Sequence, residues 1–172
     1  IVVGASGIVP HGWVGTEIQY LNLLKESTWR NFFQKNQVKA ILAEHVWEHL
    51  TLDEGELAAK NCFKFLKKGG YVRVAVPDGF FPDKKYIDHV KINGIGDGAD
   101  DHKVLYNYKT FSEVFEKAGF QINLLEYFDE DGKFTYHEWS KDDGMIYRSK
   151  RYDKRNKDKI RYTSIILDAI KK

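Results

Sequence analysis

The segment from Val38 to Asp78 constrains the fold more than any other part of the chain. It opens with an apolar run at 38–43, whose length and β-branched residues suit a buried strand. The sequence TLDE at 51–54 is typical of a capping box, and apolar residues then recur at helical spacing. A second apolar run follows at 71–76. Strand, helix and strand in so short a span predict a βαβ unit within a parallel sheet that helices cover.

The same kind of pattern predicts the other elements. We expect Lys67-Lys68-Gly69-Gly70 to close the central helix, with cations in its last turn and glycine where the chain turns left-handed. A second capping box, Thr110 with Glu113, predicts another helix that stops at Gly119. Further strands are expected at 1–3, 12–18, 121–128, 133–139 and 162–170, and short helices at 28–33 and 84–90.

Length and composition limit the class of protein. The chain has 172 residues and a formal net charge of +2, so we expect one domain over 1–172 and no obligatory nucleic-acid or membrane partner. The only cysteine, Cys62, lies on an expected helix stripe, which excludes a disulfide framework and favours a cytoplasmic location. No segment approaches a membrane span, and no signal peptide is visible. The chain begins at Ile1 inside an expected strand, so residues missing upstream are suspected.

Small or acidic residues follow four of the expected strands. These are the turn Gly4 to Gly7, then Glu17, then Glu44 with His45, and finally Asp78. Each has an ordinary structural explanation when taken singly, as a turn or as a solvated charge. Because the carboxyl ends of parallel strands meet at one edge, together they predict a ligand site there.

A glycine-rich, acidic loop at 93–102 separates the central unit from the second capped helix. Such a loop is too flexible for the core and is typical of a lid over a site. A surface excursion without function remains the alternative.

Several of these motifs resemble the class I S-adenosylmethionine-dependent methyltransferases, in particular a bacterial group with EHxxEHL and LKxGGxxRxxxPD motifs. The matching segments are 1–7, Gly12-Trp13 with Glu17, EHVWEHL at 44–50 and LKKGGYVRVAVPD at 66–78. The resemblance implies a Rossmann-like α/β fold with a mostly parallel, seven-stranded sheet and an antiparallel last strand. Only Ile8 to His11 separate the glycine turn from the next strand, so the first crossover helix is expected to be reduced or absent.

The resemblance also implies S-adenosylmethionine as the cofactor. The glycine turn Gly4 to Gly7 would border the methionine part of this cofactor. Glu17 would bind its ribose hydroxyls, and residues 43–45 would form the edge near its methyl group. The implied cofactor-binding residues are Gly4, Ala5, Ser6, Gly7, Glu17, Ala43, Glu44 and His45. An oxygen or nitrogen acceptor must also lose a proton. The candidates for that catalytic base are His45, His49, Asp78 and His102.

The spacing His45-x-x-Glu48-His49 raises metal binding as an alternative, because the three positions share one face of a helical turn. It matches an inverted zinc-protease motif, but too little helix precedes the Thr51 cap. A similar ExxEH occurs in some metal-dependent O-methyltransferases, where a downstream histidine such as His102 could complete the ligand set. Glu48 and His49 could equally anchor the following helix. The sequence analysis therefore assigns no metal ligand.

The segment from Arg148 to Arg161 holds eight basic residues and two acidic ones. It could steer an anionic substrate, although most such runs are solvated loops. We expect a small-molecule or anionic substrate, with nucleic acid possible but not indicated because aromatic residues interleave thinly. The methyl acceptor and the oligomeric state stay open. The rival hypotheses are a non-catalytic binding module with this fold and a metal-dependent hydrolase that uses His45, Glu48 and His49.

Overall fold

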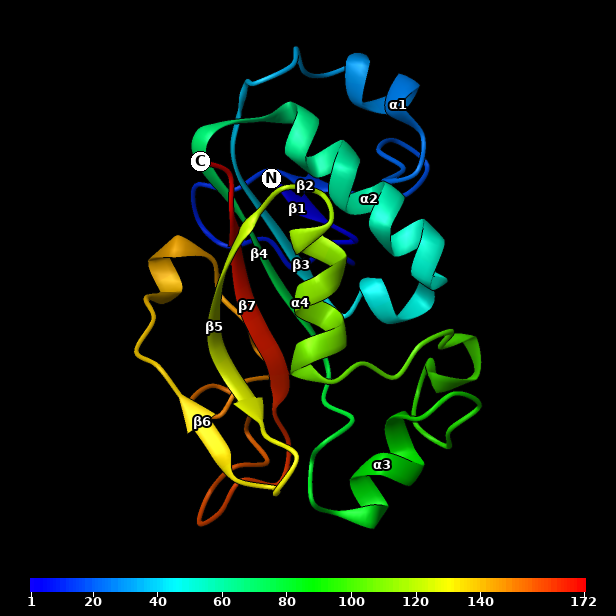
Figure 1. Cartoon of the computed structure of the whole chain (residues 1–172), viewed down its shortest axis with the longest axis vertical. Coiled ribbons are helices and arrows are strands. Elements are labelled where there is room, and N and C mark those ends of the chain that lie inside the picture. Colours follow the sequence, from blue (N-terminus) through cyan, green and yellow to red (C-terminus); the bar gives the residue numbers. More distant parts are fainter.

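The computed structural model describes residues 1–172 and contains one mixed sheet of seven strands with helices packed on one face (Figure 1). The strand order across the sheet is β2-β1-β3-β4-β7-β5-β6. The strands are β1 (Val2–Val3), β2 (Gly15–Thr16), β3 (Val38–Glu44), β4 (Leu66–Pro77), β5 (Gln121–Phe128), β6 (Phe134–Tyr136) and β7 (Ser164–Ile170).

Strand directions follow the expected βαβ unit. β1 pairs in parallel with both β2 and β3, and β3 pairs in parallel with β4. β7 lies antiparallel between β4 and β5, and β6 forms an antiparallel hairpin with β5. The chain passes from β1 to β2 on one side and then returns to β3 on the other side of β1. The strand order therefore reverses between β1 and β3, and this is the switch point of the sheet.

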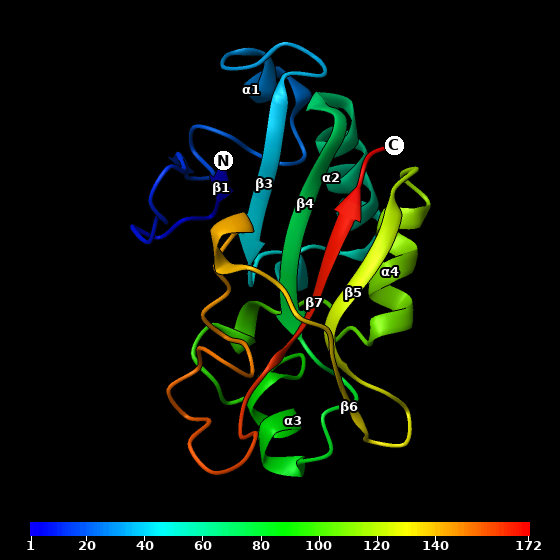
Figure 2. The same cartoon turned by 90° about the vertical axis from the view of Figure 1, so that its left-hand side faces the viewer.

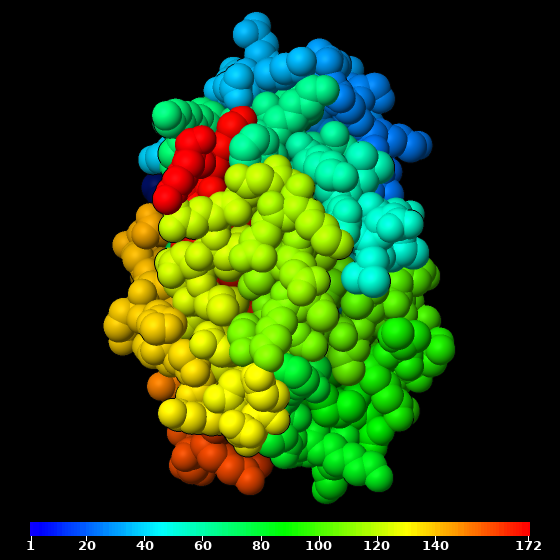
Figure 3. Space-filling view, viewed as in Figure 1, coloured from blue at the N-terminus to red at the C-terminus, as the bar shows by residue number.

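The helices are α1 (Glu26–Arg30), α2 (Leu52–Phe65), α3 (Lys84–Val90) and α4 (Tyr108–Glu116), with 3-10 turns at Trp47–His49, Ala99–Asp101 and Lys141–Asp143. Residues 4–14, between β1 and β2, form turns only. Figure 2 shows α2 and α4 behind the sheet, and Figure 3 shows their residues at the surface in the upper and central part of the view. No helix has both the length and the apolar character needed to cross a membrane.

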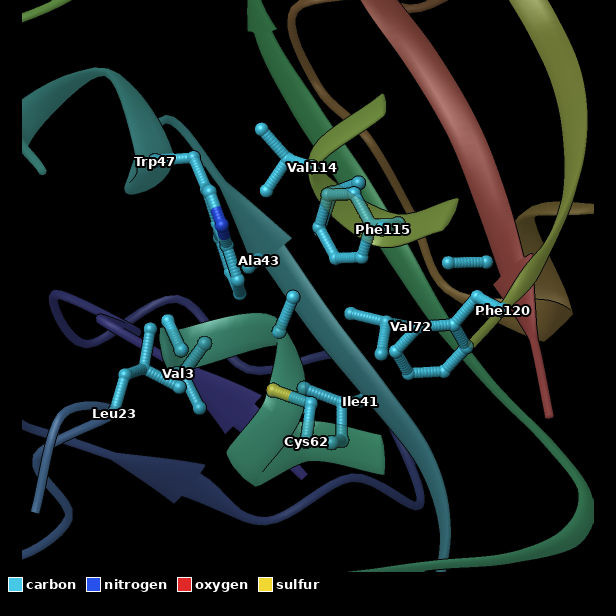
Figure 4. Packing of buried hydrophobic residues seen from close by; sticks show 14 of the residues in the cluster. Val3, Leu23, Ile41, Ala43, Trp47, Cys62, Val72, Val114, Phe115 and Phe120 are labelled. Carbon is cyan, nitrogen blue, oxygen red and sulfur yellow. The ribbon is translucent and has the colours of Figure 1, made fainter. Parts of the chain in front are cut away.

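Alternation along the strands divides the core into two layers. In β3, Ile41 and Ala43 point to the helices, whereas Leu42 between them points to the opposite face. The helix-side layer contains Trp47 and Phe115, whose rings lie 5.2 Å apart (Figure 4). This layer holds most of the buried apolar side chains, so α2 and α4 are fixed to the sheet mainly by hydrophobic burial.

The opposite face of the sheet is covered by the connection between β6 and β7, residues 137–163, which crosses it in Figure 2. Trp139 and Ile146 of this β6–β7 connection pack on Leu42 and Ala75 of the sheet. A stretch with almost no regular secondary structure thus takes the place that helices occupy on the other side.

One of the predicted helix ends is confirmed, and two lie at other residues than predicted. The Thr51 capping box is confirmed, because its hydroxyl accepts from Glu54 N and Glu54 accepts from Thr51 N. However, α2 ends at Phe65, and Gly69, with φ +76°, lies within β4 instead of closing the helix. The N-cap of the second capped helix, α4, is Asn107 and not Thr110, because the Asn107 side chain accepts from two first-turn amides.

The Thr51 cap provides a direct test of local helix stabilisation. Replacing Thr51 by alanine removes the acceptor for Glu54 N, and the free energy of unfolding should fall by about 1 kcal/mol. Urea unfolding followed by circular dichroism measures this change. Thr51→Ser keeps the hydroxyl and should retain the wild-type stability; an equal loss in both variants would show that the cap hydroxyl is not responsible.

Candidate functional site

A pocket of about 400 Å³ opens at the switch point, beyond the carboxyl ends of β1 and β3. Its volume falls within the range of roughly 300–1,000 Å³ that is usual for small-molecule sites. The lining includes Gly4, Ala5, Ser6, Glu44, His45, Glu48, His49, Asp97, His102, Met145, Tyr147 and Arg148. The structure therefore brings together most of the residues that the sequence analysis placed at this edge.

The turn after β1 forms one wall of the pocket. Gly4 has φ +61° and Ser6 has φ +46°, so two of three consecutive residues adopt left-handed backbone. A Cβ atom on Gly4 would lie 3.1 Å from Val46 Cγ2. The turn is tied to β2 by a hydrogen bond from Ala5 N to Thr16 O. Glycine at position 4 thus keeps the backbone close to the pocket and free of this contact.

Four of the expected site residues do not line the pocket: Gly7, Glu17, Ala43 and Asp78. Gly7 follows the turn outside the lining, and Glu17 is half-buried at the end of β2. Ala43 points into the helix-side core because side chains alternate along β3, and Leu42 lines the pocket in its place. The Gly12-Trp13 motif borders a separate hollow near the start of β3.

Asp78 is buried and serves as an anchor between strands. Its carboxylate accepts hydrogen bonds from Phe80 N at 2.9 Å and from Phe128 N at 2.7 Å. Burial raises the pKa of Asp78 to about 6, against the lowering effect of these two amides. Since both oxygens are engaged away from the pocket, this residue does not act on a molecule bound there.

His45 lies in the wall, with both ring nitrogens facing protein groups. Nε2 lies 3.0 Å from Ser164 Oγ, and that hydroxyl donates to Arg148 O, so it accepts from the ring. Nδ1 lies 2.8 Å from Glu48 Oε1. Position 45 also has φ +56°, an uncommon backbone for a residue with a side chain. With both nitrogens occupied, His45 positions its neighbours and has no free nitrogen for a bound molecule.

The Glu44 carboxylate binds the β6–β7 connection. It accepts from Tyr147 N at 3.0 Å and from Arg148 N at 2.6 Å. These two bonds hold Met145, Tyr147 and Arg148 against the pocket. Glu44 was expected to contact a cofactor directly; in the structure its oxygens fix the segment that closes one side of the site.

Glu48, His49 and His102 converge in the same wall. Each offers a ligand atom, and the three atoms lie within 4.8 Å of one another. The rings of His49 and His102 meet edge to face with their centroids 4.9 Å apart. The glycine-rich loop that carries His102 is fastened beside Glu48, because Lys103 N donates to Glu48 O at 2.7 Å. The group that assembles is therefore Glu48-His49-His102, not the His45-Glu48-His49 spacing read from the sequence.

The sequence analysis missed Asp97 and the three pocket residues of the β6–β7 connection: Met145, Tyr147 and Arg148. Asp97 lies in the loop that was expected to form a lid, so the loop was identified but its lining residue was not. Of the other three, only Arg148 belongs to the basic run at 148–161, and no sequence pattern pointed to Met145 or Tyr147.

Comparison with known proteins identifies the fold. No family model and no curated protein matches the chain. Among solved structures, the chain resembles a possible histamine N-methyltransferase from Thermotoga maritima, described as S-adenosylmethionine-dependent, at TM-score 0.51 and 15% identity, over 92% of this chain and 63% of that one. An S-adenosylmethionine-dependent methyltransferase from Archaeoglobus fulgidus matches at TM-score 0.51 and 13% identity, over 92% and 67%. The CurJ carbon methyltransferase matches at TM-score 0.51 and 12% identity, over 92% and 35%.

These likenesses show that the chain has the Rossmann-like α/β fold of such methyltransferases. The chain spans less than two thirds of the length of the Thermotoga maritima protein and about a third of the CurJ domain. The activity of this chain must therefore be argued from its own pocket.

Proposed function

We propose that this chain binds S-adenosylmethionine in the switch-point pocket and transfers its methyl group to an acceptor bound beside it. The observation that carries the proposal is the position of the pocket. In open α/β sheets, ligands bind beyond the carboxyl ends of the strands where the strand order reverses. Here that crevice is bounded by the glycine turn after β1 and by the end of β3.

The residues present fit such a cofactor in part. Gly4, Ala5 and Ser6 allow close approach to the backbone of the turn. S-adenosylmethionine has no phosphate group, so the pocket does not need a helix N-terminus below this turn. Glu17 stands at the carboxyl end of β2 and no hydrogen bond engages its carboxylate, but it lies outside the pocket lining. On this side the pocket is lined by Ile8 and Pro10 of the β1–β2 connection, which offer no carboxylate for the ribose hydroxyls.

When bound, the cofactor supplies an electrophilic methyl group on a sulfonium. The chain's contribution is to hold donor and acceptor in line, which orientation alone can provide. The hydrogen bonds of Glu44 keep Tyr147 and Arg148 beside the pocket. For an oxygen or nitrogen acceptor, His49 and His102 are the imidazoles left to take part in proton removal, since Asp78 and His45 are engaged elsewhere.

A non-catalytic binding module with the same fold is the second candidate. Two observations favour it: only turns connect β1 to β2, and Glu17 lies outside the pocket. Both leave the nucleoside side of the site with fewer contacts. Titration calorimetry with S-adenosylmethionine and with S-adenosylhomocysteine separates the candidates. Micromolar binding of both ligands is expected for the enzyme, and no binding of either would exclude methyl transfer.

Gly4→Val is expected to weaken binding of S-adenosylmethionine at least tenfold. The new side chain would be strained at φ +61° and would meet Val46 at the wall of the pocket. Gly7→Val is the matched control, because Gly7 has φ +79° but has nothing within 4 Å of its Cβ position and lies outside the lining. Calorimetry with both variants measures the difference. Equal losses would show that backbone strain, and not the pocket, determines the affinity.

A further inference from the structure

We propose that Glu48, His49 and His102 bind a divalent transition-metal ion in the wall of the pocket. This site rests on the geometry of the three side chains alone and does not depend on methyl transfer. With a metal ion bound, His49 and His102 would be ligands and not the groups that remove a proton from the acceptor. It differs from the HxxEH spacing of the sequence, because His102 comes from a loop some fifty residues away and His45 is excluded by its contact with Ser164.

The first support is the state of the Glu48 carboxylate. Its residue is 1% exposed, and no hydrogen bond of good geometry reaches either oxygen. The nearest polar group is the His45 ring, whose Nδ1 lies 2.8 Å from Oε1, and Oε2 has no partner. A buried carboxylate with a single polar neighbour is short of hydrogen-bond donors, which is destabilising. A cation held by the same oxygens would remove this penalty.

The second support is the orientation of His102. This side chain is 8% exposed, and its Nδ1 lies 2.7 Å from Val90 O. Since a carbonyl can only accept, Nδ1 carries a proton and donates it, which leaves the Nε2 lone pair unprotonated in the neutral ring. A carbonyl behind one ring nitrogen is the usual arrangement that fixes a metal-binding histidine. His49 adds a second imidazole, whose Nδ1 makes no hydrogen bond of good geometry and lies 3.5 Å from Asp101 Oδ2.

The donor set and the spacing define the class of ion. Two imidazoles and one carboxylate suit zinc and other divalent first-row transition metals better than magnesium or calcium, which prefer oxygen ligands only. In a tetrahedral zinc site with bonds of about 2.1 Å, the ligand atoms lie about 3.4 Å apart. The present separations are within 4.8 Å, so the side chains would have to move closer to one another to bind the ion. All three residues line the pocket, so the remaining position of the ion would face the bound molecule.

The experiment uses the full chain without a histidine tag, freed of metal by dialysis against a chelator. Titration with Co²⁺ should give a visible absorption band that saturates at one equivalent, and calorimetry with Zn²⁺ should give the same stoichiometry. Glu48→Gln, His49→Gln and His102→Asn should each weaken binding by about 100-fold or more, because loss of a direct ligand exceeds the 10–100-fold cost of a supporting residue. Asparagine at 102 can still donate to Val90 O, so the loop should remain in place.

His137→Gln is the matched control, since this exposed histidine lies outside the pocket and should bind metal as the wild type does. Thermal unfolding of each variant without metal confirms that it is folded. The proposal is overturned if the wild type binds neither ion, or if all three ligand variants bind as tightly as His137→Gln. Calorimetry with S-adenosylmethionine on the metal-free protein tests the proposed function separately, so failure of one leaves the other standing.

Discussion

Arg73→Met should lower the free energy of unfolding by about 3–5 kcal/mol, the usual loss when one partner of a buried ion pair is removed. Arg73 is 2% exposed, and its guanidinium forms two hydrogen bonds of 2.8 Å to the carboxylate of Asp168 on the neighbouring strand. It also donates to Ser140 O and Gly144 O in the β6–β7 connection. The variant therefore leaves a carboxylate and two carbonyls without their donor.

Urea unfolding measures the effect, and two further variants interpret it. Arg73→Met combined with Asp168→Leu should recover part of the loss, because no charge then remains unpaired in the sheet. Arg30→Met, which breaks an exposed ion pair with Glu26, should leave the unfolding midpoint almost unchanged. If Arg73→Met behaves like Arg30→Met, the buried pair does not hold the connection to the sheet.

Glu126→Ala should lower the free energy of unfolding by about 3 kcal/mol or more, because it leaves buried donors unsatisfied. The Glu126 side chain accepts from Trp139 Nε1 at 3.0 Å, Lys150 N at 2.7 Å and Thr163 Oγ1 at 2.8 Å. These three donors lie at both ends and in the middle of the β6–β7 connection. Glu126 thus holds the β6–β7 connection against β5 at three points.

The pH dependence of stability tests the same residue. Burial raises the pKa of Glu126 above its ordinary value of 4.5, against the lowering effect of its three donors. The Glu126 carboxyl group therefore binds its proton more tightly in the folded chain than in the unfolded chain. Its contribution to stability is complete below pH 4.5 and declines as the pH rises through the folded-state pKa.

Glu126→Gln removes that titration and keeps one acceptor oxygen. It should be less destabilising than Glu126→Ala and should flatten the part of the pH profile above pH 4.5. Urea unfolding at several pH values measures both effects. A profile for Glu126→Gln parallel to that of the wild type would show that another group is responsible.

Both residues bear on the site, because the segment they fix carries Met145, Tyr147 and Arg148 to the pocket. We expect Arg73→Met and Glu126→Ala to weaken binding of S-adenosylmethionine as well as stability. Neither residue touches the pocket, so such a loss would act through the position of the β6–β7 connection.

The regular elements could be predicted because their signals are local. β3, α2, α3 and β5 occur where periodicity, capping residues and turn residues placed them, within a residue or a few. The carboxyl-edge argument also located the pocket, because parallel strands necessarily end together. It did not determine side-chain direction, since a shift of one residue along a strand moves a side chain to the other face. For example, Ala43 was expected at the site but points into the helix-side core, and its neighbour Leu42 lines the pocket.

The sequence by itself determined the βαβ core, the edge at which a ligand would bind, and the histidine-rich turn after β3. Only the tertiary structure decided that Asp78 and His45 are held by internal partners, and that His102 joins Glu48 and His49. It also decided that an irregular connection, fastened by Arg73 and Glu126, covers the open face of the sheet. The reason is that these contacts join residues far apart in the chain. Local sequence periodicity does not predict such pairs. They form only when the folded core brings their buried donors and acceptors together.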